Sequence, residues 1–328
     1  MTRAIPLDAV VPEDEAQPVL VEIVRSGFVK GVHRGRLVLL DADGSVALEI
    51  GDARETLLPR SCSKPMQAVG MLDVGLDLDG ELLAIAAGSH KAQDFHLGAV
   101  RKILAEAGLG EEALQTPPGH PGNEQALIEF HRRGEQEAPI YYNCSGKHAA
   151  MLSVSVRNGW PTESYLEPAH PVQLACRAAI ERLSGERIAA EAVDGCGAPL
   201  LGLSLLGLAR AVRNCAVAEP GTHERRVAAA MRAHPEYVAG DGELDTVAMR
   251  AVPGLLAKTG AESVYVAALE DGRTVAFKID DGAKRARPVV LAEALRRLDV
   301  PSAEVASFGS VPLLGGGRPV GELRAVFG

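Results

Sequence analysis

Residues 35–50 read GRLVLLDADGSVALEI, two apolar stretches joined by the segment DADG at residues 41–44. Apolar runs bounded by an Asp-Gly turn are typical of a β-hairpin, so we expect strands at 35–40 and 45–50. The run VLVEIV at residues 19–24 predicts a further strand ahead of this hairpin. The folded part of the chain is therefore expected to begin with strands.

A second hairpin is predicted near the other end of the chain, where SVYVAAL (263–269) and RTVAFKI (273–279) flank the turn EDG. Residues 320–327 are expected to form a closing strand. Helical periodicity dominates the middle of the chain. The predicted helices are 66–72, 80–87, 98–107, 124–131, 168–183, 200–212 and 224–233, with one more at 289–298.

This order of strands, helices and strands indicates an α+β fold, in which the N- and C-terminal strands meet in one antiparallel sheet. We expect an extended lead-in over residues 1–18 and a single catalytic unit over 19–328. Within that unit, the strands are predicted in 19–58 and 258–328, around a mostly helical region at 59–257.

The composition of the chain argues against some classes of binding partner. The chain has 328 residues and a net charge of −9, which argues against nucleic-acid or anionic membrane binding. No apolar run reaches the roughly 20 residues of a membrane span, and the N-terminus does not resemble a signal peptide. We therefore expect a cytoplasmic protein.

Arg60-Ser61-Cys62-Ser63-Lys64-Pro65 is the first candidate for chemistry. Ser61 and Lys64 are three residues apart, which places two side chains on one helix face. Pro65 is tolerated near a helix start and disfavours helical geometry at Lys64, so a tight first turn is expected. A capping serine with a surface lysine is the alternative interpretation.

Two further motifs suggest that Ser61 and Lys64 do not act alone. Lys258-Thr259-Gly260 precedes a predicted strand, the order found in penicillin-recognising serine enzymes. Ser89, in Gly88-Ser89-His90-Lys91, occupies the place of a middle serine that passes protons to a leaving group. A turn lysine and a helix-capping serine are the ordinary alternatives.

The five cysteines are widely spaced and form no CxxC pair, so free thiols or metal ligands are favoured over disulfides. Cys144 and Cys196 could hold a tetrahedral Zn²⁺ together with a third donor. From the residues alone His148 is the better third ligand, because lysine binds metal only when deprotonated. Buried free cysteines are the alternative.

Taken together, these segments resemble the rhizobial-type L-asparaginases over nearly the whole chain. The segments that carry the resemblance are Arg60-Ser61-x-x-Lys64-Pro65, Ser89-His90, Asn143-Cys144-Ser145-Gly146-Lys147-His148, Asp194-Gly195-Cys196-Gly197-Ala198-Pro199 and Ala257-Lys258-x-Gly260-Ala261-Glu262. The block at 143–148 is the most family-specific, since β-lactamases have no counterpart. Thr259 is a departure, because a smaller residue is expected there in some relatives, and it leaves the substrate less defined.

The resemblance implies a fold like that of class A serine β-lactamases and serine glutaminases, in a homodimer. It implies Ser61 as nucleophile beside Lys64, and a second pair of Ser89 with Lys258. It also implies a Zn²⁺ held by Cys144, Lys147 and Cys196, which leaves His148 beside the metal ligands. Asp194, Arg60 and His148 are then the candidates for substrate binding.

The expected activity is hydrolysis of the side-chain amide of L-asparagine, a small-molecule substrate. A glutaminase or a penicillin-recognising hydrolase of the same fold is the alternative. A non-enzymatic zinc-binding protein is a more distant one.

Overall fold

The two ends of the chain meet in one antiparallel sheet, as predicted. The computed structural model describes residues 17–327. In it β1 (Val19–Arg25) pairs antiparallel with β11 (Arg318–Ala325), and β2 (Phe28–Leu40) pairs antiparallel with β9 (Thr274–Ile279). Of the expected lead-in over 1–18, only Gln17 and Pro18 lie within the described residues.

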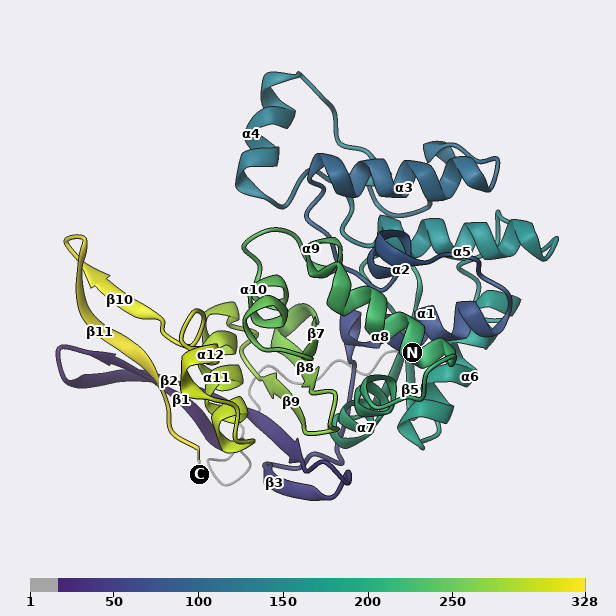
Figure 1. Ribbon diagram of the computed structural model, residues 1–328. Helices are drawn as coiled ribbons and strands as arrows, with labels where there is room; N and C mark the ends of the chain where they lie inside the picture. Colours follow the sequence, from purple (N-terminus) through teal and green to yellow (C-terminus); the bar gives the residue numbers. More distant parts are fainter. Residues whose placement is uncertain (1–16, 328) are drawn as a thin grey trace, which may run out of the picture.

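Eight strands form this sheet, in the order β10-β11-β1-β2-β9-β8-β7, with β3 pairing to β2. Both predicted hairpins are present, β2 with β3 (Val46–Ile50) and β8 (Val264–Ala268) with β9. The remaining strands are β7 (Leu256–Thr259) and β10 (Pro312–Gly315). The start of β2 and the whole of β7 and β10 were not predicted as strands. The start of β2 has no clean alternation of apolar and polar residues, and β7 and β10 have only four residues each. Figure 1 shows β10 and the start of β2 beside β1 and β11, where the four strands extend away from the helices.

A second, three-stranded sheet lies inside the region expected to be helical. It consists of β4 (Thr56–Leu57), β6 (Pro199–Ser204) and β5 (Ala190–Val193), in that order. The predicted helix at 200–212 is therefore wrong in its first part, since α7 begins only at Leu205. The apolar run at 200–203 suits either a helix or a strand, and pairing with β4 and β5 decides for the strand.

Helices fill the middle of the chain and cover the main sheet (Figure 1). They are α1 (Lys64–Asp73), α2 (Gly80–Ala86), α3 (Asp94–Glu106), α4 (Glu124–Arg132), α5 (Ser145–Arg157), α6 (Pro171–Ser184), α7 (Leu205–Ala216), α8 (His223–Ala233), α9 (Pro235–Val238), α10 (Leu244–Ala251), α11 (Arg287–Arg297) and α12 (Ser302–Val305). Short 3-10 turns are η2 (Arg60–Ser63), η3 (Glu111–Ala113), η4 (Pro139–Tyr141), η5 (Ala261–Ser263) and η6 (Lys284–Ala286). Helices α5, α9, α10 and α12 were not predicted. No helix in residues 17–327 has the length and apolarity needed to cross a bilayer.

The edge strand β7 positions the candidate site. It is the last strand of the main sheet, and it packs against both η2 and α10. Helix α7 packs on β8 and β9, and α11 packs on β9 and β11, so the sheet is supported by helices while β7 is left beside the Ser61 turn.

Candidate active site

Ser61 lies in the 3-10 turn η2, directly before α1 begins at Lys64. The expected tight first turn is therefore present. Pro65 occupies the first turn of α1, where a missing N–H costs nothing. The expectation that Pro65 would keep Lys64 out of helical geometry is wrong, since Lys64 has φ −60° and ψ −38°. Arg60, just before Ser61, takes the unusual left-handed conformation at φ 53°.

Lys64 is buried, with only 1% of its surface exposed. Its Nζ donates hydrogen bonds to the carbonyl of Gly88 at 2.5 Å and to Oγ of Ser89 at 2.9 Å. The amine is thereby aimed at the middle serine motif, and within the described residues it makes no hydrogen bond to Ser61. The first lysine and the second serine are thus the pair in direct contact.

A close backbone contact holds Ser89 in place. The Ser89 N–H donates to the carbonyl of Val238, the last residue of α9, at 2.6 Å. A Cβ added to Gly88 would lie 2.7 Å from the carbonyl oxygen of Tyr237 and 2.9 Å from that of Val238. Glycine at position 88 is therefore required for Ser89 to approach this segment.

Lys258 is the other buried lysine of the site, with 0% of its surface exposed. Its Nζ donates to the carbonyl of Thr259 at 2.7 Å and lies 3.9 Å from Oδ2 of Asp245. Burial lowers the pKa of Lys258 to about 8, helped by the charge of Lys64 and opposed by that of Asp245. An amine with such a pKa changes its charge near neutral pH.

Strand β7 is fastened to the turn that carries Ser61. The thiol of Cys62 donates to the carbonyl of Lys258 at 3.2 Å. A Cβ on Gly260 would lie 2.8 Å from the carbonyl oxygen of Pro59 and 3.0 Å from Sγ of Cys62. The glycine of the Lys-Thr-Gly motif is thus the residue that lets the strand run against the turn.

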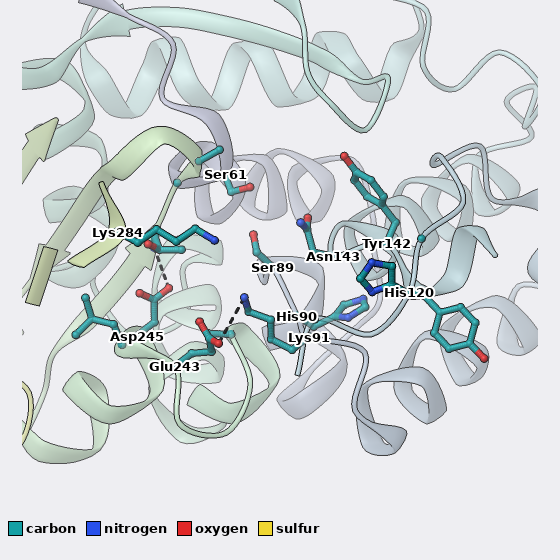
Figure 2. Close-up of a pocket in the computed structure, with 18 of the residues that line it drawn as sticks. Ser61, Ser89, His90, Lys91, His120, Tyr142, Asn143, Glu243, Asp245 and Lys284 are labelled. Carbon is teal, nitrogen blue, oxygen red and sulfur yellow. Dashed lines mark hydrogen bonds and ion pairs between the residues drawn. The ribbon is translucent and has the colours of Figure 1, made fainter. Parts of the chain in front are cut away.

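A cavity of about 700 Å³ opens beside these side chains, and Figure 2 shows Ser61 and Ser89 facing it. One side of the cavity carries the ion pair between Lys91 and Glu243, at 3.4 Å. The residues that line it are Ser61, Ser89, His90, Lys91, Pro118, Gly119, His120, Gly122, Glu137, Tyr141, Tyr142, Asn143, Ala239, Glu243, Leu244, Asp245, Thr259, Gly260, Ala261, Glu262, Lys284 and Arg287. Both serines of the predicted pairs therefore share one polar cavity of the size that holds a small molecule.

The three residues predicted to bind substrate are not among the residues that line the cavity. Nε of Arg60 donates to Asp194 at 2.8 Å, and Nη1 of Arg60 donates to Glu262 at 2.6 Å. His148 is fully buried, and its Nδ1 lies 2.7 Å from the hydroxyl of Tyr165. Since Arg60, Asp194 and His148 do not line the cavity, their contacts with substrate stay predictions.

The predicted zinc ligands lie together next to the lysines. Cys144 and Cys196 belong to one small buried cluster, and Nζ of Lys147 lies 3.4 Å from Sγ of Cys196. The hydrogen bond from Cys196, with the charges of Lys64 and Lys147, holds the pKa of Cys144 well below its usual value. Burial would lower the pKa of Lys147, but the charges of Cys196 and Cys144 raise it instead. Two thiol groups and an amine are thus gathered in one buried place.

Motif reasoning missed several residues of the site. Asp245, Glu243, Lys284 and Arg287 all line the cavity and belong to no recognisable motif, while Lys91 ends the Gly88–Lys91 motif without having been assigned a role. Asp245 is the most consequential, because it is a buried carboxylate facing a buried lysine. Its position in an unpredicted helix, far along the chain from Ser61, left no signal by which to find it.

The amino-acid sequence matches the model of the family described as L-asparaginase II over residues 21–325. This chain therefore belongs to the L-asparaginase II family, a family of amide-hydrolysing enzymes. No curated protein matches it.

Several solved structures are similar at low identity. Mglu in its native form has 14% identity and a TM-score of 0.45, covering 82% of this chain and 65% of that one. A Bacillus glutaminase has 12% identity and a TM-score of 0.44, covering 81% and 91%. A β-lactamase (Mb2281c) from Mycobacterium bovis has 12% identity and a TM-score of 0.41, covering 81% and 95%. This chain thus spans 65% of the length of Mglu. At these scores the likeness is distant, and the family membership does not depend on it.

Proposed function

We propose that this chain is an amidohydrolase, and specifically an L-asparaginase that hydrolyses the side-chain amide of L-asparagine by Ser-Lys acyl transfer. The observation that carries the proposal is the hydrogen bond from buried Lys64 to Ser89, at the wall of a cavity that Ser61 shares. Membership of the L-asparaginase II family supports the choice of a linear amide as substrate.

In the first step, Oγ of Ser61 attacks the amide carbonyl carbon and Lys64 in its neutral form takes the hydroxyl proton. The product is a tetrahedral oxyanion bonded to Ser61. The N–H groups of Ser61 and Ala261 are suited to stabilise it, since neither donates to an acceptor within residues 17–327. One such donor contributes roughly 3–4 kcal/mol in other hydrolases.

In the second step, the C–N bond breaks and the proton taken by Lys64 goes to the departing ammonia. The 2.9 Å hydrogen bond between Lys64 and Ser89 supports Ser89 as the path for that proton. Lys258, with a pKa of about 8, accepts or returns a proton at little cost near neutral pH. Water then hydrolyses the β-aspartyl ester of Ser61, which releases aspartate.

A bound Zn²⁺ fits the donors near this site. Among the described residues no three His, Cys, Asp or Glu side chains are grouped so that they could hold a metal, and the proposed site therefore includes a lysine. Lys147 would be the third donor beside Cys144 and Cys196, and it would have to release a proton on binding, since, against the effect of burial, the two sulfurs raise its pKa. Nε2 of His148 is buried there without a partner in the described chain. We propose that Cys144, Lys147 and Cys196 hold the ion. When bound, zinc would help to orient the polar groups of the substrate, because Ser61 already supplies the nucleophile.

The proposed hydrolysis is tested by measuring ammonia release from L-asparagine and L-glutamine with the wild type and with Ser61→Ala. We expect the variant to lose turnover by roughly 10³-fold or more. Ser63→Ala is the matched control, because Ser63 lies in the same turn and its hydroxyl bonds only the carbonyl of Arg60 at 2.8 Å. Substantial turnover by Ser61→Ala would sink the nucleophile, and a preference for glutamine would sink the choice of asparagine.

The proposed zinc site is tested by metal analysis of Cys196→Ser. We expect this variant to lose its bound zinc, while Cys215→Ser, a change at a buried thiol outside the cluster, keeps it. A full complement of metal in Cys196→Ser would exclude this ligand set. The homodimer implied by the resemblance stays a prediction, which light scattering of the purified protein would check.

A further inference from the structure

Asp245 is a buried carboxylate that faces Lys258 across the wall of the cavity. It lies in the first turn of α10, and only 1% of its surface is exposed. Its Oδ2 lies 3.9 Å from Nζ of Lys258, which is a charge pair without a direct hydrogen bond. Leaving either charge buried without the other would be strongly unfavourable.

The Asp245 carboxylate and the Lys258 amine also bond the two backbone groups of Thr259. Oδ2 of Asp245 accepts a hydrogen bond from the N–H of Thr259 at 2.8 Å. Nζ of Lys258 donates to the carbonyl of the same Thr259 at 2.7 Å. Asp245 thus holds Thr259 through its N–H, while the Lys258 amine bonds the carbonyl in the next peptide group of the same residue. The carboxylate also compensates the charge of the amine.

A tyrosine completes this arrangement. Tyr265 pairs with Thr259 in the register of β7 and β8. The Tyr265 hydroxyl and Oδ1 of Asp245 are both buried, and neither has a hydrogen-bond partner within residues 17–327. Burial and the nearby Asp245 charge keep the pKa of Tyr265 well above its usual value, so the hydroxyl keeps its proton beside the carboxylate.

Several other groups face Lys258, and Asp245 makes the largest favourable contribution to its positive charge. Lys64, from α1, opposes that charge, and Cys62 and Cys144 add smaller favourable effects. Burial raises the pKa of Cys62 to about 12, so that thiol is neutral at physiological pH. Burial has the largest effect on the pKa of Lys258, and among the groups that favour its charged form Asp245 contributes most.

We infer that Asp245 is a positioning residue of the active site, which acts through Lys258 by holding its amine against Thr259 and by setting the pH at which that amine loses its proton. The kinetic consequence rests on the proposed function, since it assumes that Lys258 exchanges protons during amide hydrolysis. The effect on the amine itself is independent of any activity.

The test is an NMR titration of the lysine side chains in Asp245→Asn, which removes the charge and keeps the size of the side chain. The chain has eight lysines, and Lys258→Arg identifies the Lys258 signal. We expect its midpoint to fall by roughly one pH unit or more. Thr246→Val is the matched control on the same helix, since Thr246 bonds only the carbonyls of Pro235 and Gly240. It should lower stability without moving the Lys258 midpoint, and an unmoved midpoint in Asp245→Asn would overturn the inference.

Two further measurements separate this inference from the proposed function and from simple misfolding. If the wild type releases no ammonia from either amide, the proposed function fails, and the titration still decides the role of Asp245. If Asp245→Asn does not fold, the double variant Asp245→Asn with Lys258→Met should fold, because it removes the unpaired buried charge. A double variant that also fails to fold would contradict the charge pairing.

Discussion

Lys64 and Lys258 are both buried beside the same cavity, but the two regions that hold them differ in what faces the amine. At the start of α1, Lys64 donates to neutral oxygens, the carbonyl of Gly88 and the hydroxyl of Ser89. On the edge strand β7, Lys258 lies near the carboxylate of Asp245. Burial lowers the pKa of Lys258 to about 8, although the charge of Asp245 acts in the opposite direction. The first region provides a hydrogen-bond path between lysine and serine. The second provides a charge that changes near neutral pH.

This difference suggests that the two lysines have different roles in the proposed reaction. The contribution of Lys64 depends mainly on its hydrogen-bond geometry, and that of Lys258 depends mainly on its charge. Both regions depend on a glycine that allows a close backbone approach, Gly88 in the first and Gly260 in the second. Substitutions made separately in the two regions therefore test whether the two lysines have different roles.

The largest effect is expected from Lys64→Met, which keeps most of the side-chain volume and removes the amine. We expect kcat for ammonia release to fall by roughly 10³-fold, because both the base and the donor to Ser89 are lost. Steady-state kinetics on the folded variant measure this. A loss of less than tenfold would mean that Lys64 is not the base.

A smaller loss, of roughly 10²-fold, is expected from Lys258→Met, since the Lys64–Ser89 hydrogen bond is retained. The variant should also lose the pH dependence described below. If Lys258→Met lowers kcat more than Lys64→Met does under the same conditions, Lys258 and not Lys64 is the more important proton acceptor.

The glycine substitutions should reduce kcat/KM by roughly 10- to 100-fold, since each displaces one side of the site. Gly88→Ala would push Ser89 from the end of α9, and Gly260→Ala would push β7 from the Ser61 turn. Each should also lower the free energy of unfolding by about 1–3 kcal/mol. Gly98→Ala is the control, because nothing lies within 4 Å of a Cβ added there. Chemical denaturation and kinetics together check both effects.

The smallest effect near neutral pH, about tenfold between pH 8 and pH 7, is a pH dependence of the wild type. The neutral amine is the form that accepts a proton, so kcat/KM should rise as the pH passes upward through about 8, the pKa of Lys258. Below that pH the activity should fall about tenfold for each unit, as the neutral fraction does. The profile is measured between pH 6 and pH 10. A flat profile through pH 8 would show that the charge of Lys258 does not limit the reaction.

Features of the fold and the site that depend on a few neighbouring residues could be predicted from the amino-acid sequence, and those that depend on distant residues could not. The hairpins at both ends were predicted correctly, because alternation and Asp-Gly turns act over a few neighbouring residues. The strand β6 was mistaken for helix, because its apolar run suits both states until β4 and β5 pair with it. The side chains Ser61, Lys64, Ser89 and Lys258 were found by motif, and the structure gathers them beside one cavity. Their proposed catalytic roles are still predictions.

The amino-acid sequence was enough to predict the two hairpins, the arrangement of strands around a mostly helical middle, the chemical groups of the site and the resemblance to an asparaginase family. Only the tertiary structure decided that Lys64 bonds Ser89 rather than Ser61, and that Asp245 faces Lys258. The physical reason is that hydrogen bonds and buried charge pairs depend on distances of a few ångströms between residues far apart in the chain. Those distances are set by the packing of η2 and α10 against the edge strand β7 and of α1 against α2, which no local pattern in the amino-acid sequence shows.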